Sequence, residues 1–167
     1  MEQETQQALM SLVGLSLVAA GRLPSIEWLE FEAATSQAEQ NDKCVLHLEC
    51  MWRITSDVKI LVAWTDRYLS VDGEEADVEI IGEGNLCDTL MHDLILHESS
   101  QTLTVTEVLT DQFGGFKLLL SGDLTLEVFP DISWPSEYWR LFKPGQRESH
   151  FAMKSNGVIT KGKLWGG

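Results

Sequence analysis

The sequence predicts a β-rich α+β fold in which two units, each a helix followed by an antiparallel meander, form one domain. The length supports this fold, because 167 residues with 44% hydrophobic content suit a single domain, residues 1–167, with a substantial core. A repeated pattern supports it too, because each half starts with a helical pattern and continues with short strand-like runs. The halves span about residues 4–70 and 86–160, and residues 71–85 form an acidic connection between them.

The first half begins with a helical pattern at Glu4–Val13, where apolar residues recur at i, i+3 and i+4. Strand-like runs follow at Leu15–Ala19, Ile26–Glu32 and Cys44–Ile54. The third run alternates apolar and polar residues, so that its two cysteines, Cys44 and Cys50, share a buried face with Trp52. Both cysteines are therefore predicted to be small core hydrophobes.

The apolar stretch Ala8–Ala20 is predicted to be a core element rather than a signal peptide or a membrane span. It follows Glu2 and Glu4 instead of the basic residues of a secretory signal, and its 13 residues fall short of the roughly 18 that span a bilayer. Three cysteines are too few, and of the wrong parity, for a disulfide framework. These observations predict a cytoplasmic protein.

The second half begins with a helical pattern at Leu86–His97, in which the large apolar residues fall on one face. Strand-like runs follow at Leu103–Leu109, Phe116–Leu120, Leu124–Phe129 and Tyr138–Phe142, with two shorter candidates at Ser149–Met153 and Val158–Thr160. Gly122, within one of the turns, supplies the positive φ that a tight hairpin needs. The tripeptide Trp-Arg-aliphatic begins at Trp52 and again at Trp139, which supports an internal repeat.

Charge is distributed very unevenly along the chain. Residues 1–100 contain 19 acidic and 5 basic residues, a net charge of −14, whereas residues 101–167 contain 7 of each. An acidic surface of this kind attracts cationic partners and repels nucleic acid. Six of the acids fall within residues 72–83, which contain no base. The predicted partner-binding residues are these acids and a tryptophan in a polar loop: Asp72, Glu74, Glu75, Asp77, Glu79, Glu83 and Trp134.

A second candidate site lies on the polar face of the run Cys44–Ile54. His47 and Glu49 suit a general acid–base pair, and Arg53 suits a clamp for a carboxylate or phosphate. The nearby tripeptide Asp66, Arg67 and Tyr68 extends this possible ligand face. The competing interpretation is a solvated sheet face whose charges pair across strands.

Metal and catalytic motifs are not recognisable in the sequence. Cys44 and Cys50 would lie about 20 Å apart along one strand and cannot share an ion. His92 and His97 are five residues apart rather than the four of a helical metal pair, and Asp88 with His92 suits a surface pair. The sequence therefore predicts no cofactor, no metal site and no enzymatic activity.

Several segments together resemble a family of small bacterial proteins of unknown function. The resemblance covers about residues 12–70 and 103–153 and rests on SLVAAGRLPSIEWLEF, HLECMWRI, TDRY and GGFKLLLSGDLTLEVFPD…EYWRLFKPG…HFAM. The chain departs from the family pattern at Met51, where the family tends to have proline. The meander pattern is also similar to that of small immunity proteins of bacterial toxin systems, which is an analogy of architecture.

Three functional hypotheses follow. The leading one is a non-catalytic binding protein of the immunity or inhibitor kind that occludes a basic partner, such as a toxin or nuclease, with its acidic surface. The second is a small-ligand-binding or enzymatic domain that uses the polar sheet face. The third is an inhibitor that mimics the charge of DNA and binds a defence or nucleic-acid enzyme. A homodimer is compatible with each, and neither a membrane nor nucleic acid is expected as a partner.

Overall fold

The computed structural model describes residues 2–33, 43–79, 84–97, 102–145 and 150–161, with residues 97 and 158–161 described by their backbone only. The helices are α1 (Glu2–Leu9) and α2 (Leu86–His97), with two short 3-10 helices, η1 (Met10–Leu12) and η3 (Trp64–Tyr68). The strands are β1 (Leu15–Leu23), β2 (Ile26–Ala33), β3 (Cys44–Leu48), β4 (Met51–Thr55), β5 (Ile60–Ala63), β6 (Leu103–Thr110), β7 (Phe116–Leu120), β8 (Leu124–Phe129), β9 (Glu137–Phe142), β10 (His150–Lys154) and β11 (Gly157–Lys161).

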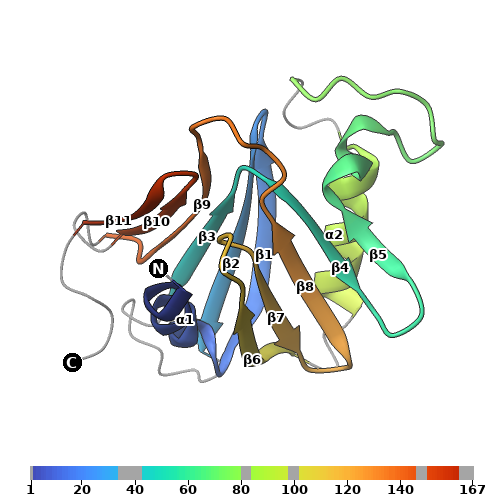
Figure 1. The fold of residues 1–167 in the computed structure, drawn as a ribbon. Coiled ribbons are helices and arrows are strands. Elements are labelled where there is room, and N and C mark those ends of the chain that lie inside the picture. The colour runs from blue at the N-terminus through green and yellow to red at the C-terminus, as the bar shows by residue number, and fades with distance from the viewer. Residues whose placement is uncertain (1, 34–42, 80–83, 98–101, 146–149, 162–167) are drawn as a thin grey trace.

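The strands form one antiparallel sheet that folds into two layers. Its order is β11-β10-β9-β3-β2-β1-β6-β7-β8-β4-β5. Only two residue pairs, Ser16↔Thr104 and Leu17↔Leu103, join β1 to β6, so the sheet turns a corner there. Figure 1 shows β3, β2 and β1 crossing β7, β8 and β4, with α1 and α2 on opposite flanks. A β-rich α+β fold is therefore confirmed.

The predicted run Cys44–Ile54 is two strands rather than one. The chain bends at residues 49–50, where the Glu49 N–H donates to the Tyr138 carbonyl at 2.8 Å, and β3 and β4 continue in different layers. β3 pairs with β9 of the second half, and β4 pairs with β8. The fourth strand of each half thus lies beside the third strand of the other half. Each layer consequently contains strands of both halves.

The core lies between the two layers. The Trp139 ring in β9 meets the Phe116 ring in β7 edge-on at 5.1 Å and stacks on Phe151 at 5.6 Å. Its indole N–H donates to the Gly114 carbonyl at 2.7 Å, which ties the β6–β7 turn to the first layer. Trp52 in β4 is equally buried, as are all the apolar positions of the predicted alternation from Cys44 to Ile54.

Several boundaries differ from the sequence prediction. The helical pattern at Glu4–Val13 is α1 followed by η1, whereas α2 has the predicted bounds. β5 and η3 were not predicted, because four apolar residues followed by one helical turn carry too little periodicity. The connection between the predicted runs Ile26–Glu32 and Cys44–Ile54 lies largely outside the described residues. No helix in the described part of the chain combines the length and apolar character that a membrane span requires.

Candidate functional site

Residues 72–79 of the acidic connection form a hydrogen-bonded segment on the surface. This part, Asp72–Glu79, is called the acidic segment below. The Ser70 N–H donates to the Glu74 carbonyl at 2.8 Å, and the Ala76 N–H donates to the Tyr68 carbonyl at 2.8 Å. Leu69 and Glu75 form an antiparallel bridge. In Figure 1 the segment is part of the green arc above β5 and α2. Backbone bonds therefore hold the acidic segment in a defined shape.

The carboxylates of the acidic segment point into solvent. All five are exposed: Asp72, Glu74, Glu75, Asp77 and Glu79. Among the described residues, no ion pair joins any of them to a lysine or arginine. Exposed apolar side chains, Tyr68, Leu69 and Val71, precede them directly. The segment thus presents uncompensated negative charge beside apolar surface.

Of the two other predicted partner-binding residues, Trp134 is described by the structure and Glu83 is not. Trp134 lies in the loop between β8 and β9 and is 72% exposed, an unusual fraction for a tryptophan. The loop is held in place, because the Tyr138 hydroxyl donates to the Ile132 carbonyl at 2.9 Å. Glu83 lies outside the described residues. Trp134 is therefore available for contact, on an element separate from the acidic segment.

A cluster of charged groups, called the buried charge cluster below, lies where the acidic segment joins the body. Arg22, Glu27 and Arg67 are buried in it, and Asp88 is partly buried. Arg22 and Glu27 are opposite each other in the β1–β2 ladder. Glu27 is 1% exposed, and neither of its carboxylate oxygens has a hydrogen bond to a described residue. Burial raises the pKa of Glu27 to about 8, against the opposing influence of Arg67. Glu27 is therefore largely protonated at neutral pH.

The arginines of this cluster anchor the acidic segment and its flanks. The Arg22 side chain donates to the Val78 carbonyl at 2.7 Å and, through Nε, to Asp88 in α2 at 3.1 Å. Arg67 donates from Nη2 to the Leu23 carbonyl at 2.9 Å, and its guanidinium lies 4.0 Å from the centre of the Trp64 ring. The predicted pair of Asp88 with His92 is therefore wrong, because Asp88 pairs with Arg22.

The predicted polar face is divided between the two layers. His47 in β3 and the exposed Glu49 belong to the outer face of the first layer, beside Arg140 of β9. Arg53 lies in β4 of the second layer and bonds to Glu127 instead. The bend at residues 49–50 separates these groups, so the alternation that places them on one face of a single strand does not apply. Desolvation, with Arg140 nearby, lowers the pKa of His47.

The other members of the predicted ligand face have mainly structural contacts. Asp66 accepts a hydrogen bond from the Ala63 N–H at 2.7 Å and so caps η3. Arg67 is 1% exposed within the buried charge cluster, whereas Tyr68 is exposed beside the acidic segment. The structure therefore does not bring Asp66, Arg67 and Tyr68 together with His47 and Glu49.

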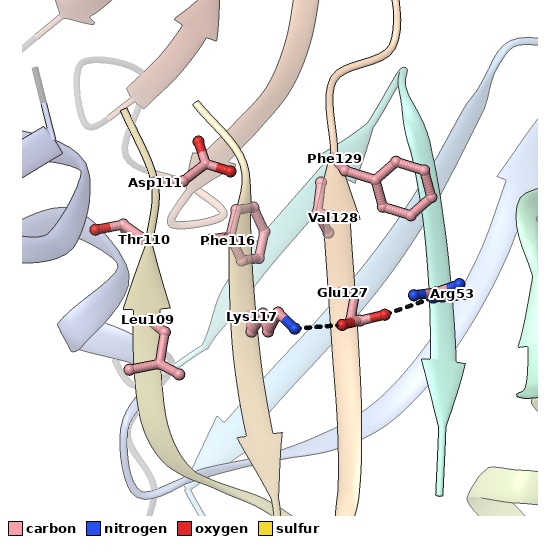
Figure 2. A pocket seen from close by; sticks show the side chains of 9 residues that line it. All are labelled: Arg53, Leu109, Thr110, Asp111, Phe116, Lys117, Glu127, Val128 and Phe129. Atoms are coloured by element: carbon pink, nitrogen blue, oxygen red, sulfur yellow. Dashed lines mark hydrogen bonds and ion pairs between the residues drawn. The ribbon is translucent and has the colours of Figure 1, made fainter. Parts of the chain in front are cut away.

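A depression of about 310 Å³ opens on the outer face of the second layer and is called the Arg53 pocket below (Figure 2). Glu127 lies between two cations there, with Lys117 Nζ at 2.6 Å and Arg53 Nε at 2.5 Å. The three residues are direct partners across β7, β8 and β4. Lys117 and Glu127 were not predicted as site residues, because only the strand register brings them beside Arg53.

All three cysteines are buried and form no disulfide, as predicted for Cys44 and Cys50. Desolvation raises the pKa of Cys50 to about 12, and it also raises the pKa of Cys87. Little reactive thiolate is expected at either position. Among the described residues, no group of three or more His, Cys, Asp or Glu side chains is placed to hold a metal ion.

Three comparisons with known proteins return no match. No family model matches the chain, and neither the curated proteins nor the solved structures yield a similar protein. The resemblance to a family of small bacterial proteins accordingly stays a prediction.

Proposed function

We propose that this protein is a non-catalytic binding protein, of the immunity or inhibitor kind, whose acidic segment occludes a basic protein partner. The observation that carries the proposal is the acidic segment itself, five exposed carboxylates without a described cationic partner. Charges on a flexible tail would cost conformational entropy on binding, whereas this segment is already ordered by backbone hydrogen bonds. The adjacent Tyr68, Leu69 and Val71 offer apolar contact area to the same partner.

The proposal extends to the partner and the compartment. A toxin or nuclease with a basic active-site surface fits the charge, and the free cysteines suit the reducing cytoplasm. The predicted division into two helix-plus-meander units also belongs to the proposal, with the strands of each unit from the fourth onward lying in the same layer as the other unit's first three strands. A DNA-charge mimic would use the same carboxylates, and the nature of the captured partner distinguishes the two.

The test compares two variants of equal charge. The segment variant replaces Glu74, Glu75, Asp77 and Glu79 with serine. The control variant replaces four exposed acids elsewhere, Glu2, Asp57, Glu107 and Asp93, with serine. Each immobilised protein is incubated with lysate of the native host, and the retained proteins are identified. A basic protein retained by the wild type and the control variant but lost by the segment variant is expected.

The outcomes separate clearly. If the three proteins retain the same basic proteins in the same amounts, the acidic segment is a solubilising connection and the proposal fails. If all three retain an acidic or neutral protein, the partner binds another surface, and Trp134 is the first residue to replace.

A further inference from the structure

The Arg53 pocket is lined by both charged and exposed apolar side chains. Figure 2 shows the Lys117–Glu127–Arg53 row crossing β7, β8 and β4, with Phe129 above Arg53 and Leu109 on the far side of Lys117. Phe129 is 42% exposed and Leu109 is 46% exposed, so both offer apolar surface to a visiting molecule. The pocket volume of about 310 Å³ falls at the lower end of the range for small-molecule sites.

The charges in the row do not cancel. Glu127 supplies one carboxylate to two cations, and it uses only Nε of Arg53. The two Nη groups of Arg53 have no hydrogen bond to a described residue, and Lys117 has further N–H groups beyond the one that meets Glu127. The Asp111 carboxylate, at the end of the pocket, accepts from the N–H groups of Phe113 and Gly115 at 2.7 and 2.9 Å. The row therefore has donors to spare for one further anion.

The geometry points to a binding site for a small amphipathic monocarboxylate, whose carboxylate meets the Nη groups of Arg53 and the Lys117 ammonium while its apolar body lies against Phe129. The guanidinium of Arg53 lies 5.7 Å from the centre of the Phe129 ring, and this cation–π contact keeps the guanidinium beside the apolar side of the pocket. Arginine presents its paired N–H groups to a carboxylate in a matching plane. This site is independent of the acidic segment and of the proposed protein partner.

Glu127 makes the inference sharply testable. Lys117 and Arg53 hold the pKa of Glu127 below its usual range, so its charge is present at neutral pH and partly neutralises both cations. A bound carboxylate therefore competes with Glu127 for the same donors. Replacing Glu127 by glutamine keeps the shape of the side chain but removes its negative charge. The positive charges of Lys117 and Arg53 are then no longer neutralised, so the affinity for an anion should rise.

The probe is 3-phenylpropionate, with 3-phenylpropionamide as its uncharged counterpart, titrated into 15N-labelled protein. From the binding free energy typical per ligand atom, a dissociation constant on the order of 1 mM is expected, with shifts at the amides of β7, β8 and β4. Arg53→Met should weaken binding about tenfold or more, Lys117→Met about threefold, and Glu127→Gln should strengthen it about threefold. Arg140→Gln, which removes an arginine paired with Glu137 in the other layer, should leave binding unchanged.

Two results would overturn the inference. One is the absence of saturable shifts at these strands up to about 10 mM probe, roughly ten times the expected constant. The other is equal binding of the acid and the amide, or loss of affinity in Glu127→Gln, either of which would show that the carboxylate does not use the two cations.

Discussion

The acidic segment and the buried charge cluster are in contact, but their carboxylates differ in solvent exposure and in charged neighbours. In the acidic segment, Asp72–Glu79, the side chains are exposed and no described cation pairs with them. In the buried charge cluster beneath it, Glu27 and Asp88 are surrounded by Arg22 and Arg67. Arg22 belongs to both regions, because it bonds to Asp88 and also to the Val78 carbonyl of the segment. The exposed carboxylates therefore keep a charge that acts outward, whereas the partly buried Asp88 bonds to Arg22, which in turn bonds to the acidic segment.

Removing an arginine from the buried cluster should have the largest effect. Arg67→Ala deletes a fully buried guanidinium together with its contact to Trp64 and its bond to the Leu23 carbonyl. Removing a buried side chain of this size leaves a cavity and an unpaired buried carbonyl, which typically costs about 2–5 kcal/mol of unfolding free energy. Arg140→Ala, at a partly exposed ion pair, should cost no more than about 1 kcal/mol. Urea denaturation measures both losses, and equal losses would contradict the comparison.

Two further variants separate the loss of charge at Arg67 from the loss of side-chain volume. Arg67→Met keeps much of the side-chain volume, and combining it with Glu27→Leu removes the two most deeply buried ionisable groups of the cluster. The double variant should recover stability relative to Arg67→Met alone, since well-packed apolar residues often replace buried charges without loss. A double variant less stable than either single variant would show that the cost of burying these ionisable groups does not lower the stability of the protein.

Glu27 should give the protein a characteristic pH dependence. Its pKa is about 8 in the folded protein and near the ordinary 4.5 when unfolded, so between these values the folded state binds more protons. The unfolding free energy must therefore fall as pH rises through this window, by up to about 1.4 kcal/mol per pH unit from this group. In Glu27→Gln that contribution disappears, so the unfolding free energy of the variant should rise relative to that of the wild type from pH 5 to pH 9. Parallel stability curves would show that Glu27 is solvated.

The acidic segment should show the smallest effect on stability. Its carboxylates make no described ion pair, and surface substitutions usually change the unfolding free energy by less than about 0.5 kcal/mol each. The segment variant should therefore unfold cooperatively at nearly the wild-type urea concentration. Loss of cooperative unfolding would assign these residues to the structure rather than to a partner.

Local patterns were enough to predict much of the secondary structure. The bounds of α2, β7 and β8 agree with the predicted runs, because helical and alternating periodicity are properties of neighbouring residues. The placement of β4 and β9 beside strands of the other half could not be predicted, since strand order depends on contacts far apart in the chain. The bend at residues 49–50 was hidden because Cys50 continues the apolar alternation on both sides of it.

The candidate sites follow the same division. The acidic segment was predicted from composition alone, because charge density needs no register. The buried cluster was missed, although Glu27 shares its face with Leu29 and Phe31 in the alternating run of β2, an observable sign of burial. The Arg53 pocket needs the pairings of β7, β8 and β4, which no single segment of the sequence contains.

The central claim is that the acidic segment, and not the overall charge of the protein, attracts a basic partner. A peptide of ten lysines alternating with glycine provides a direct probe, measured by fluorescence anisotropy against the wild type, the segment variant and the control variant. At 0.01 M salt, where the Debye length is about 30 Å, the segment variant should bind about tenfold more weakly than the control variant. The difference should shrink at 0.15 M, where that length is about 8 Å. Equal affinities of the two variants would contradict the account, because net charge alone would then explain the attraction.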